Sequence, residues 1–303
     1  MKKNIYILVA IISLCCYSTI FIPPDFLWVA GFVTYSIPFI IIFNFLLFIF
    51  DLKNFRITSL IPLIILVVGW GFINDSFQYP EKKEEGPVKV LTYNVRIFNF
   101  YNRETWAKQS PAIMADWIRN TESDIICLQE FFTTPAHPNL NTLNIINKDH
   151  EYQAYNAPVV TRKDGAQFGS VIFTRYPILQ TGKVKFANST WNQAIYADVL
   201  ISGDTLRIYN LHLQSYHIDE KMIMDNEGDL QEEVTGLYSL LRTGFIRRAV
   251  QIRAVNKHIR ACRHRVLVCG DLNDLPYSYT YYQLKRILRN SFSTAGRGFG
   301  FTF

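Results

Sequence analysis

The chain has 303 residues and a formal net charge of +6, with 49% hydrophobic and 18% charged residues. This length allows one large domain or two small ones, and the composition is too apolar and too poor in charge for a purely soluble protein. Five cysteines occur without a CxxC or Cys/His zinc spacing, which argues against a zinc site and against a disulfide framework.

The apolar excess is concentrated in three blocks near the start of the chain, residues 4–22, 26–50 and 58–73. A membrane-spanning helix needs about 20 mostly apolar residues, so the first two blocks are long enough and the third is short but compatible. A cleaved signal peptide would also begin with basic residues such as Lys2 and Lys3, but no small-residue cleavage site follows the first block. We therefore predict three transmembrane helices within residues 1–75.

The basic residues predict the orientation of these helices. Lys2 and Lys3 precede the first block, and Lys53 and Arg56 lie between the second and the third, whereas the loop between the first and second has no basic residue. Basic residues are retained on the cytoplasmic side of a membrane. The chain after the third helix is therefore expected on the extracytoplasmic side.

Residues 76–87 are polar with mixed charge and are typical of a linker. Residues 88–303 then form a domain that mixes helices and strands. Strands are expected at 88–95, 123–130, 169–178, 194–202, 206–214 and 265–271, and helices at 110–120, 232–262 and 278–288. This order predicts a mixed α/β domain in which helices pack outside sheet layers.

The segment 242–265 holds seven arginines and one lysine with no acidic residue. A basic face of this kind suits a polyanionic substrate or an anionic bilayer. The alternative is a solvated helix face without a ligand.

Polar side chains recur at the carboxyl ends of the apolar strands. They are Asn94, Glu130, Asn210, His212, Asp271 and Asn273. A buried polar group costs a few kcal/mol unless it is paired, so four strands that end in this way suggest one shared site. The segment "GDLNDLPYS" is also typical of a strand-to-turn junction, and Gly270 allows the tight bend that such a junction needs.

This set of side chains suits a hard cation. Magnesium prefers oxygen ligands and takes one or two carboxylates from a protein, and manganese is an alternative. We expect Glu130 to be a direct ligand, with Asn94 and Asp271 completing or flanking the shell. His212 could donate a hydrogen bond to a phosphoryl oxygen.

Five blocks of the chain resemble, in order, the endonuclease/exonuclease/phosphatase (DNase I-like) superfamily. The blocks are "LTYNVR", "DIICLQE", "GSVIFTRYPI", "IYNLHLQ" and "VLVCGDLNDLPYS", within residues 89–303. The resemblance implies a four-layer α/β/β/α sandwich and Mg²⁺-dependent hydrolysis of phosphoesters. With the three N-terminal helices, the chain is similar to bacterial members anchored in the inner membrane.

The resemblance also implies roles for individual residues. Glu130 matches the metal-binding glutamate, and Asn94 matches the asparagine at the metal-phosphate site. His212 matches the histidine that contacts the scissile phosphate, and Asn210 is placed with the phosphate-binding residues. Asp271 and Asn273 match the pair that orients the nucleophile and binds phosphate.

The resemblance is incomplete at the C-terminus, because the chain ends at Phe303 before the Ser-Asp-His block of the family. We expect the sequence to be a fragment. Two functions follow as alternatives. The first is a membrane-anchored phosphoesterase that acts on nucleic acid, a lipid headgroup phosphodiester or a sugar-phosphate. The second is a non-catalytic, membrane-tethered binding protein on a truncated hydrolase fold.

Overall fold

A computed structural model describes residues 2–54, 56–79, 86–99, 111–187, 191–216 and 230–300. The chain divides into two compact units. The first unit comprises residues 1–84, 216–252 and 274–303, and the second comprises 85–215 and 253–273. The linker predicted at 76–87 contains the first crossing between the units. Residue 110, the first of the helix predicted at 110–120, lies outside the described residues.

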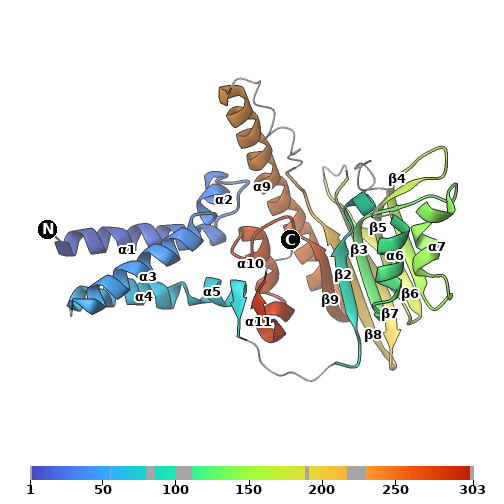
Figure 1. Cartoon of the computed structure of the whole chain (residues 1–303), viewed down its shortest axis with the longest axis horizontal. Helices are drawn as coiled ribbons and strands as arrows, with labels where there is room; N and C mark the ends of the chain where they lie inside the picture. Colours follow the sequence, from blue (N-terminus) through green and yellow to red (C-terminus); the bar gives the residue numbers. More distant parts are fainter. Residues whose placement is uncertain are drawn as a thin grey trace. The chain divides into compact units, whose positions relative to one another are not determined.

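The second unit contains two four-stranded sheets (Figure 1). The first has the order β2-β3-β5-β4, with β2 at Val90–Asn94, β3 at Ile125–Thr133, β5 at Gln167–Thr174 and β4 at Gln153–Thr161. The second has the order β6-β7-β8-β9, with β6 at Ile178–Val184, β7 at Gln193–Ile201, β8 at Asp204–His212 and β9 at Arg265–Asp271. The pairs β2/β3 and β8/β9 are parallel, and the other pairs are antiparallel.

Side-chain alternation along β3 places this sheet between two apolar layers. Ile125 and Cys127 face the second sheet and pack with residues such as Ile195 and Ile208. Ile126 and Leu128 point the opposite way, because successive side chains in a strand face opposite sides of the sheet. They pack under α6 (Pro111–Arg119) and α7 (Thr142–Ile146), which cover this face (Figure 1).

The last residues of the long helix α9 (Leu230–Ala261) belong to the second unit and cover its other sheet. His258 Nδ1 of this segment lies 2.7 Å from the hydroxyl of Tyr209 on β8. The layers are therefore helix, sheet, sheet and helix, which confirms the predicted four-layer sandwich. The sequence analysis missed β4 and joined the end of β5 to β6, which are separate strands around the turn at Arg175–Pro177.

The first unit is mainly helical. It contains α1 (Lys2–Ser18), α2 (Val29–Thr34), α3 (Ile37–Lys53), α4 (Leu60–Val68), α5 (Trp70–Ser76), α10 (Tyr279–Lys285) and α11 (Ser291–Ala295), with residues 230–252 of α9. Its short segments are η1 (Thr19–Phe21), η2 (Ile57–Ser59) and the antiparallel pair β1 (Phe77–Gln78) and β10 (Gly298–Phe299).

The predicted second membrane helix, residues 26–50, is divided into α2 and α3. Pro38 lies in the first turn of α3, where proline favours the start of a helix. In the described part of the chain, one stretch, Asn4–Phe21, is long and apolar enough to cross a membrane. A second candidate arises only if Ile57–Val68 and Trp70–Ser76, which meet at 49°, form one broken span. Three separate spans are therefore not supported.

Candidate functional site

The candidate site lies in the second unit, at the edge where parallel strands from both sheets end. Asn94 is the last residue of β2 and pairs in register with Gln129, immediately before Glu130. His212 is the last residue of β8 and pairs in register with Asp271, the last residue of β9. The topology of both sheets therefore brings these four predicted residues to the same edge.

The side chain of Asn94 joins the two carboxylates of the site. Its Nδ2 donates to Glu130 Oε1 and to Asp271 Oδ2, each at 3.0 Å. Its Oδ1 accepts from the backbone N–H of Arg96 at 2.9 Å. The reverse orientation of the amide would place its oxygen against two carboxylates, so the nitrogen faces them. In this geometry Asn94 holds the carboxylates near each other and does not offer them an oxygen.

His212 completes the cluster. Its side chain is only 8% exposed, and its Nε2 lies 3.3 Å from Glu130 Oε1. Nε2 makes no hydrogen bond in the described structure, although it is buried. A buried ring nitrogen without a hydrogen bond is costly in a stable fold, so this atom is a candidate contact for a ligand.

The backbone at the site is unusual in three places. Glu130 has a φ of 50° and lies where the pairing of β3 with β5 shifts register, between Leu128 and Phe131. Asn273 has a φ of 52°, and Gly270 has a φ of 135°. A Cβ on residue 270 would lie 2.1 Å from the Leu211 carbonyl oxygen, so only glycine fits there. Bulges and left-handed residues often reorient side chains at functional sites.

Asn273 is fixed beside the ends of β8 and β9. Its backbone N–H donates to Asp271 Oδ1 at 2.8 Å, and its Nδ2 donates to the carbonyl of Leu213 at 2.9 Å. The segment after β9 is therefore compatible with both hypotheses, a strand-to-turn junction and a part of the candidate site. The turn that Gly270 permits also holds the Asp271 carboxylate in place.

Asn210 has a different environment from the one predicted. It is fully buried, and its Nδ2 donates to the carbonyls of Leu128 and Val171, each at 2.9 Å. Its Oδ1 accepts from Gln129 Nε2 at 2.6 Å. Both amide hydrogens are used between the two sheets, so they are not available to a phosphate in this geometry. Asn210 instead connects the second sheet to the first.

Sequence reasoning missed Gln129 and Arg96. Gln129 is 1% exposed and links Asn210 to the strand that carries Glu130. Arg96 begins four consecutive residues with positive φ, Arg96–Asn99, and only Val95 separates it from the end of β2. The position of Gln129 beside Glu130 at the end of an apolar run could have indicated its role. Nothing in the sequence indicates the left-handed turn, because none of its first three residues is Gly or Asn.

The electrostatics favour an ionised Glu130. Burial raises the pKa of its carboxyl, but the approach of His212, the hydrogen bond from Asn94 and the positive charge of Arg96 lower the pKa more. The net result is a pKa below the ordinary value of 4.5. Glu130 is therefore a carboxylate at neutral pH, as a metal ligand must be.

The residues present fit a magnesium ion. Magnesium usually retains several waters and takes one or two protein carboxylates, which Glu130 and Asp271 can supply. Within the described ranges, no group of three or more His, Cys, Asp or Glu side chains has the geometry of a full metal shell. The site therefore suits a hard, partly hydrated cation that prefers oxygen ligands, and it does not resemble a structural zinc site with four protein ligands.

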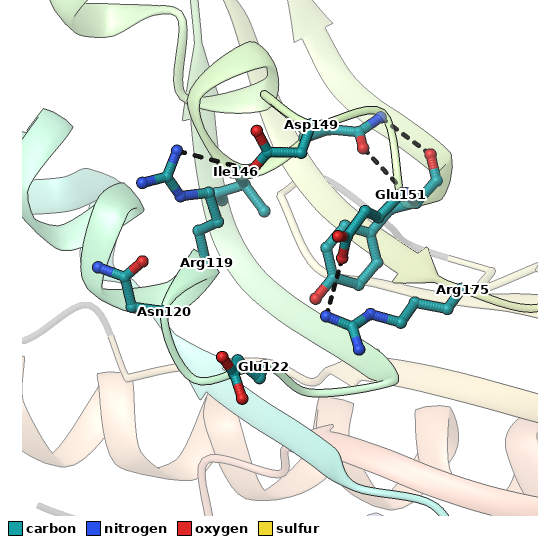
Figure 2. Close-up of a pocket in the computed structure, with 9 residues that line it drawn as sticks. Arg119, Asn120, Glu122, Ile146, Asp149, Glu151 and Arg175 are labelled. Carbon is teal, nitrogen blue, oxygen red and sulfur yellow. Dashed lines mark hydrogen bonds and ion pairs between the residues drawn. The ribbon is translucent and has the colours of Figure 1, made fainter.

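A separate pocket of about 370 Å³ lies at the opposite ends of the strands, next to the residues that precede β3 and follow β5 (Figure 2). Its cations are paired with its acids. Arg175 Nη2 lies 2.9 Å from Glu151 Oε2, and Arg119 Nη1 lies 3.9 Å from Asp149 Oδ2. Both arginines of this pocket are therefore held in ion pairs within the protein.

Two family models match separate parts of the chain. A family model described as "Endonuclease/Exonuclease/phosphatase family" matches residues 91–303. A second model, described only as a domain of unknown function (DUF8431), matches residues 4–76. No curated protein matches the chain.

Among solved structures, sphingomyelinase C from Streptomyces griseocarneus is 18% identical with a TM-score of 0.45, covering 67% of this chain and 70% of that chain. The human Nocturnin catalytic domain with bound sulfate is 17% identical with a TM-score of 0.46, covering 69% and 73%. A humanized D. rerio TDP2 is 17% identical with a TM-score of 0.41, covering 66% and 70%. Truncated Caenorhabditis elegans TDP2 is 18% identical with a TM-score of 0.40, and this chain spans 62% of its length.

Proposed function

Because the chain belongs to the endonuclease/exonuclease/phosphatase family, we propose that it hydrolyses phosphoric esters with the help of Mg²⁺ or Mn²⁺. The observation that carries this proposal is the pair Glu130 and Asp271. These carboxylates come from different sheets, share one amide of Asn94, and lie beside an imidazole nitrogen that has no hydrogen bond. Two carboxylates held together in this way leave a negative charge that a divalent cation would balance.

The proposed roles follow from the positions of the side chains. Glu130 and Asp271 would hold the cation, which when bound neutralises charge on a phosphoryl oxygen. His212 Nε2, which lies 3.3 Å from Glu130 Oε1 and makes no hydrogen bond, would contact another phosphoryl oxygen, where a donor stabilises the charge that develops in the transition state. Asn273 and Asp271 would orient the attacking water, and Asn94 would keep the carboxylates in place. We assign Asn210 to the support of the site and not to the phosphate.

We also propose that the first unit anchors the protein in a membrane. Only 22% of the window Asn4–Phe21 is buried, so α1 is not the core helix of this unit. The polar side chains of the apolar helices instead contact one another. Asn44 Nδ2 donates to Ser13 Oγ at 3.0 Å, and the buried Asp51 accepts from Tyr6 at 2.9 Å and from Thr58 at 2.7 Å. Apolar surfaces outside and polar contacts inside are typical of helices packed in lipid.

The basic residues that flank the apolar blocks favour a bacterial inner membrane protein whose second unit is extracytoplasmic. A cysteine at Lys163, which is exposed in the turn between β4 and β5, would test this topology. An impermeant maleimide should label Lys163→Cys in intact spheroplasts more than it labels the unmodified chain. Labelling that appears only after lysis would place this unit in the cytoplasm and overturn the proposed orientation.

The direct test of activity uses the full chain with Mg²⁺ and four substrates: bis-p-nitrophenyl phosphate, plasmid DNA, sphingomyelin and inositol phosphates. We expect turnover of at least one of them, loss of turnover with EDTA, and recovery with Mg²⁺ or Mn²⁺. The panel also separates a nuclease from a lipid or sugar-phosphate hydrolase. Turnover that EDTA leaves unchanged would contradict the role of the metal, and a folded protein with no turnover would favour the binding protein.

A further inference from the structure

A second pocket lies entirely in the first unit, between the apolar helices and α10. Its volume is about 350 Å³, within the range of ligand sites. Aromatic side chains make up much of its wall: Tyr17, Phe21, Phe72, Tyr277, Tyr281 and Tyr282. Pairs of these rings pack on each other, such as Phe21 and Tyr282 at 4.9 Å between centroids. The wall of this pocket is therefore largely aromatic, and its rings are packed on one another. None of its residues belongs to the candidate site in the second unit.

The pocket lies at the carboxyl end of the stretch that can cross a membrane. Tyr17 and Phe21 are in the last turns of Asn4–Phe21 and line the pocket. Tyrosine rings are enriched at the boundary between lipid tails and water, because one end is apolar and the other polar. If α1 crosses the bilayer, the pocket opens at the level of the lipid headgroups.

The chain segment that contributes α10 to the pocket is basic. Residues 275–303 carry Lys285, Arg286, Arg289 and Arg297 and no Asp or Glu. Lys285 lines the pocket, its side chain is 39% exposed, and its Nζ lies 2.5 Å from Asp75 Oδ2. The ammonium group has three donors, so this ion pair leaves donors for an external anion.

Asp75 supplies an independent sign of a ligand. It is only 5% exposed and lines the same pocket. Its Oδ1 is buried and makes no hydrogen bond within the described part of the chain. A buried carboxylate oxygen in this state would gain a hydrogen bond from a ligand hydroxyl group.

We propose that this pocket binds one anionic phospholipid with a hydroxylated headgroup. An acyl chain would fill the aromatic pocket, the phosphate would lie at Lys285, and a headgroup hydroxyl would donate to Asp75 Oδ1. The lipid is a ligand of the first unit and not a substrate. This inference rests on the proposed membrane anchor but on no step of the proposed hydrolysis.

Gly71 offers a way to fill the pocket. It lines the pocket in α5, and a Cβ added there meets no atom within 4 Å. Gly71→Leu should therefore occupy the pocket without a clash. Gly236→Leu is the matched control, since Gly236 is also helical, also has open space at its Cβ, and does not line the pocket.

The experiment places the full chain in phosphatidylcholine vesicles that contain a trace of photoactivatable phosphatidylglycerol. Mass spectrometry then measures and maps the label. We expect labelling of the peptides that line the pocket, a drop of about tenfold in Gly71→Leu and no change in Gly236→Leu, because about 1.4 kcal/mol of lost binding is tenfold. Lys285→Gln should lower labelling about fivefold, whereas Arg297→Gln, outside the pocket, should not.

Equal labelling by photoactivatable phosphatidylcholine would overturn the preference for an anionic lipid. Equal labelling of Gly71→Leu and the unmodified chain would overturn the site itself. Hydrolysis of bis-p-nitrophenyl phosphate is measured on the same samples. Labelling that persists without hydrolysis would contradict only the proposed activity, and hydrolysis without labelling would contradict only the lipid site.

Discussion

A buried polar cluster in the first unit and another in the second differ in charge balance. In the first unit, Arg248 is fully buried, and its Nε lies 3.1 Å from Asp274 Oδ2. Its Nη2 donates to the hydroxyl of Tyr216, which is 2.7 Å from that of Tyr35. In the second unit, the carboxylates of Glu130 and Asp271 share a neutral amide beside an imidazole nitrogen without a hydrogen bond.

The difference in charge balance distinguishes a cluster that stabilises the fold from a cluster that is suited to bind a cation. A buried guanidinium that meets a carboxylate and a hydroxyl has its charge and its donors satisfied, so the cluster stabilises the fold without a ligand. Two carboxylates that meet at one amide form a set of oxygen atoms whose charge a bound divalent cation would balance. Removal of a group should therefore cost stability in the first cluster and activity in the second.

The largest expected effect is on activity. Glu130→Gln removes a carboxylate from the proposed metal site and should lower kcat/KM on the order of 10³-fold, since a bound metal contributes several kcal/mol to the transition state. Without divalent cations, its unfolding midpoint should fall far less than that of Arg248→Met, because the low pKa of Glu130 shows that its carboxylate adds only some stability at neutral pH. Glu122→Gln, at an exposed position, is the control. Normal turnover in Glu130→Gln would refute its role.

Arg248→Met should have the opposite profile. It leaves Asp274 buried without its cation and should lower the free energy of unfolding by about 3–5 kcal/mol. Chemical denaturation in detergent measures this loss. The double variant with Asp274→Leu should regain much of the stability, because no buried charge remains. A double variant as unstable as Arg248→Met would show that the pair is not the source of the effect.

His212→Leu should lower kcat by about 10²-fold, because it removes a donor to the charged phosphoryl group. Metal affinity should change little, since the carboxylates remain. Steady-state kinetics and a Mn²⁺ titration on one preparation separate these quantities. Loss of metal affinity with kcat retained at saturating Mn²⁺ would instead make His212 a part of the metal shell.

Asn210→Ala tests the corrected role of Asn210. It leaves two carbonyls and the Gln129 amide without their partner and should destabilise the fold by about 1–3 kcal/mol. KM for bis-p-nitrophenyl phosphate should stay the same at a temperature where the variant is folded. An unchanged melting temperature with a raised KM would return Asn210 to the phosphate-binding set.

The smallest expected effect concerns His258, which lies outside both clusters. Burial and the charge of Arg207 lower its pKa below the ordinary value of 6.5. The unfolded chain therefore takes up this proton first, so stability is full above pH 6.5 and falls as the pH drops toward the lower folded pKa. His258→Asn should flatten the decline of the melting temperature between pH 7 and pH 5. An identical decline would assign it to other groups.

The family resemblance of the sequence blocks implied the four-layer fold, and the polar residues at the ends of apolar strands suggested one shared site for Asn94, Glu130, His212 and Asp271. The sequence could not predict how deep a polar residue lies along a strand. Asn210 precedes His212 by two residues and shares its face, yet it is fully buried between the sheets. Depth depends on how the two sheets pack, which no local pattern encodes.

The ion pair between Arg248 and Asp274 could not be predicted from the sequence either. Arg248 belongs to the basic segment that suggested a polyanion or a solvated face, but its side chain is fully buried. Asp274 lies in the segment that is typical of a strand-to-turn junction, and it is the partner of that arginine, 26 positions away. The left-handed turn at Arg96–Asn99 also had no local signal. These features depend on contacts between distant parts of the chain.

The central claim is that Glu130 and Asp271 form a divalent-cation site, and calorimetric titration of Mn²⁺ into the full chain tests it most directly. We predict saturable binding of one Mn²⁺, competed by Mg²⁺, lost in Glu130→Gln and in Asp271→Asn, and unchanged in Glu122→Gln. Binding of the same strength in all three variants, or no binding to the folded unmodified chain, would contradict the account.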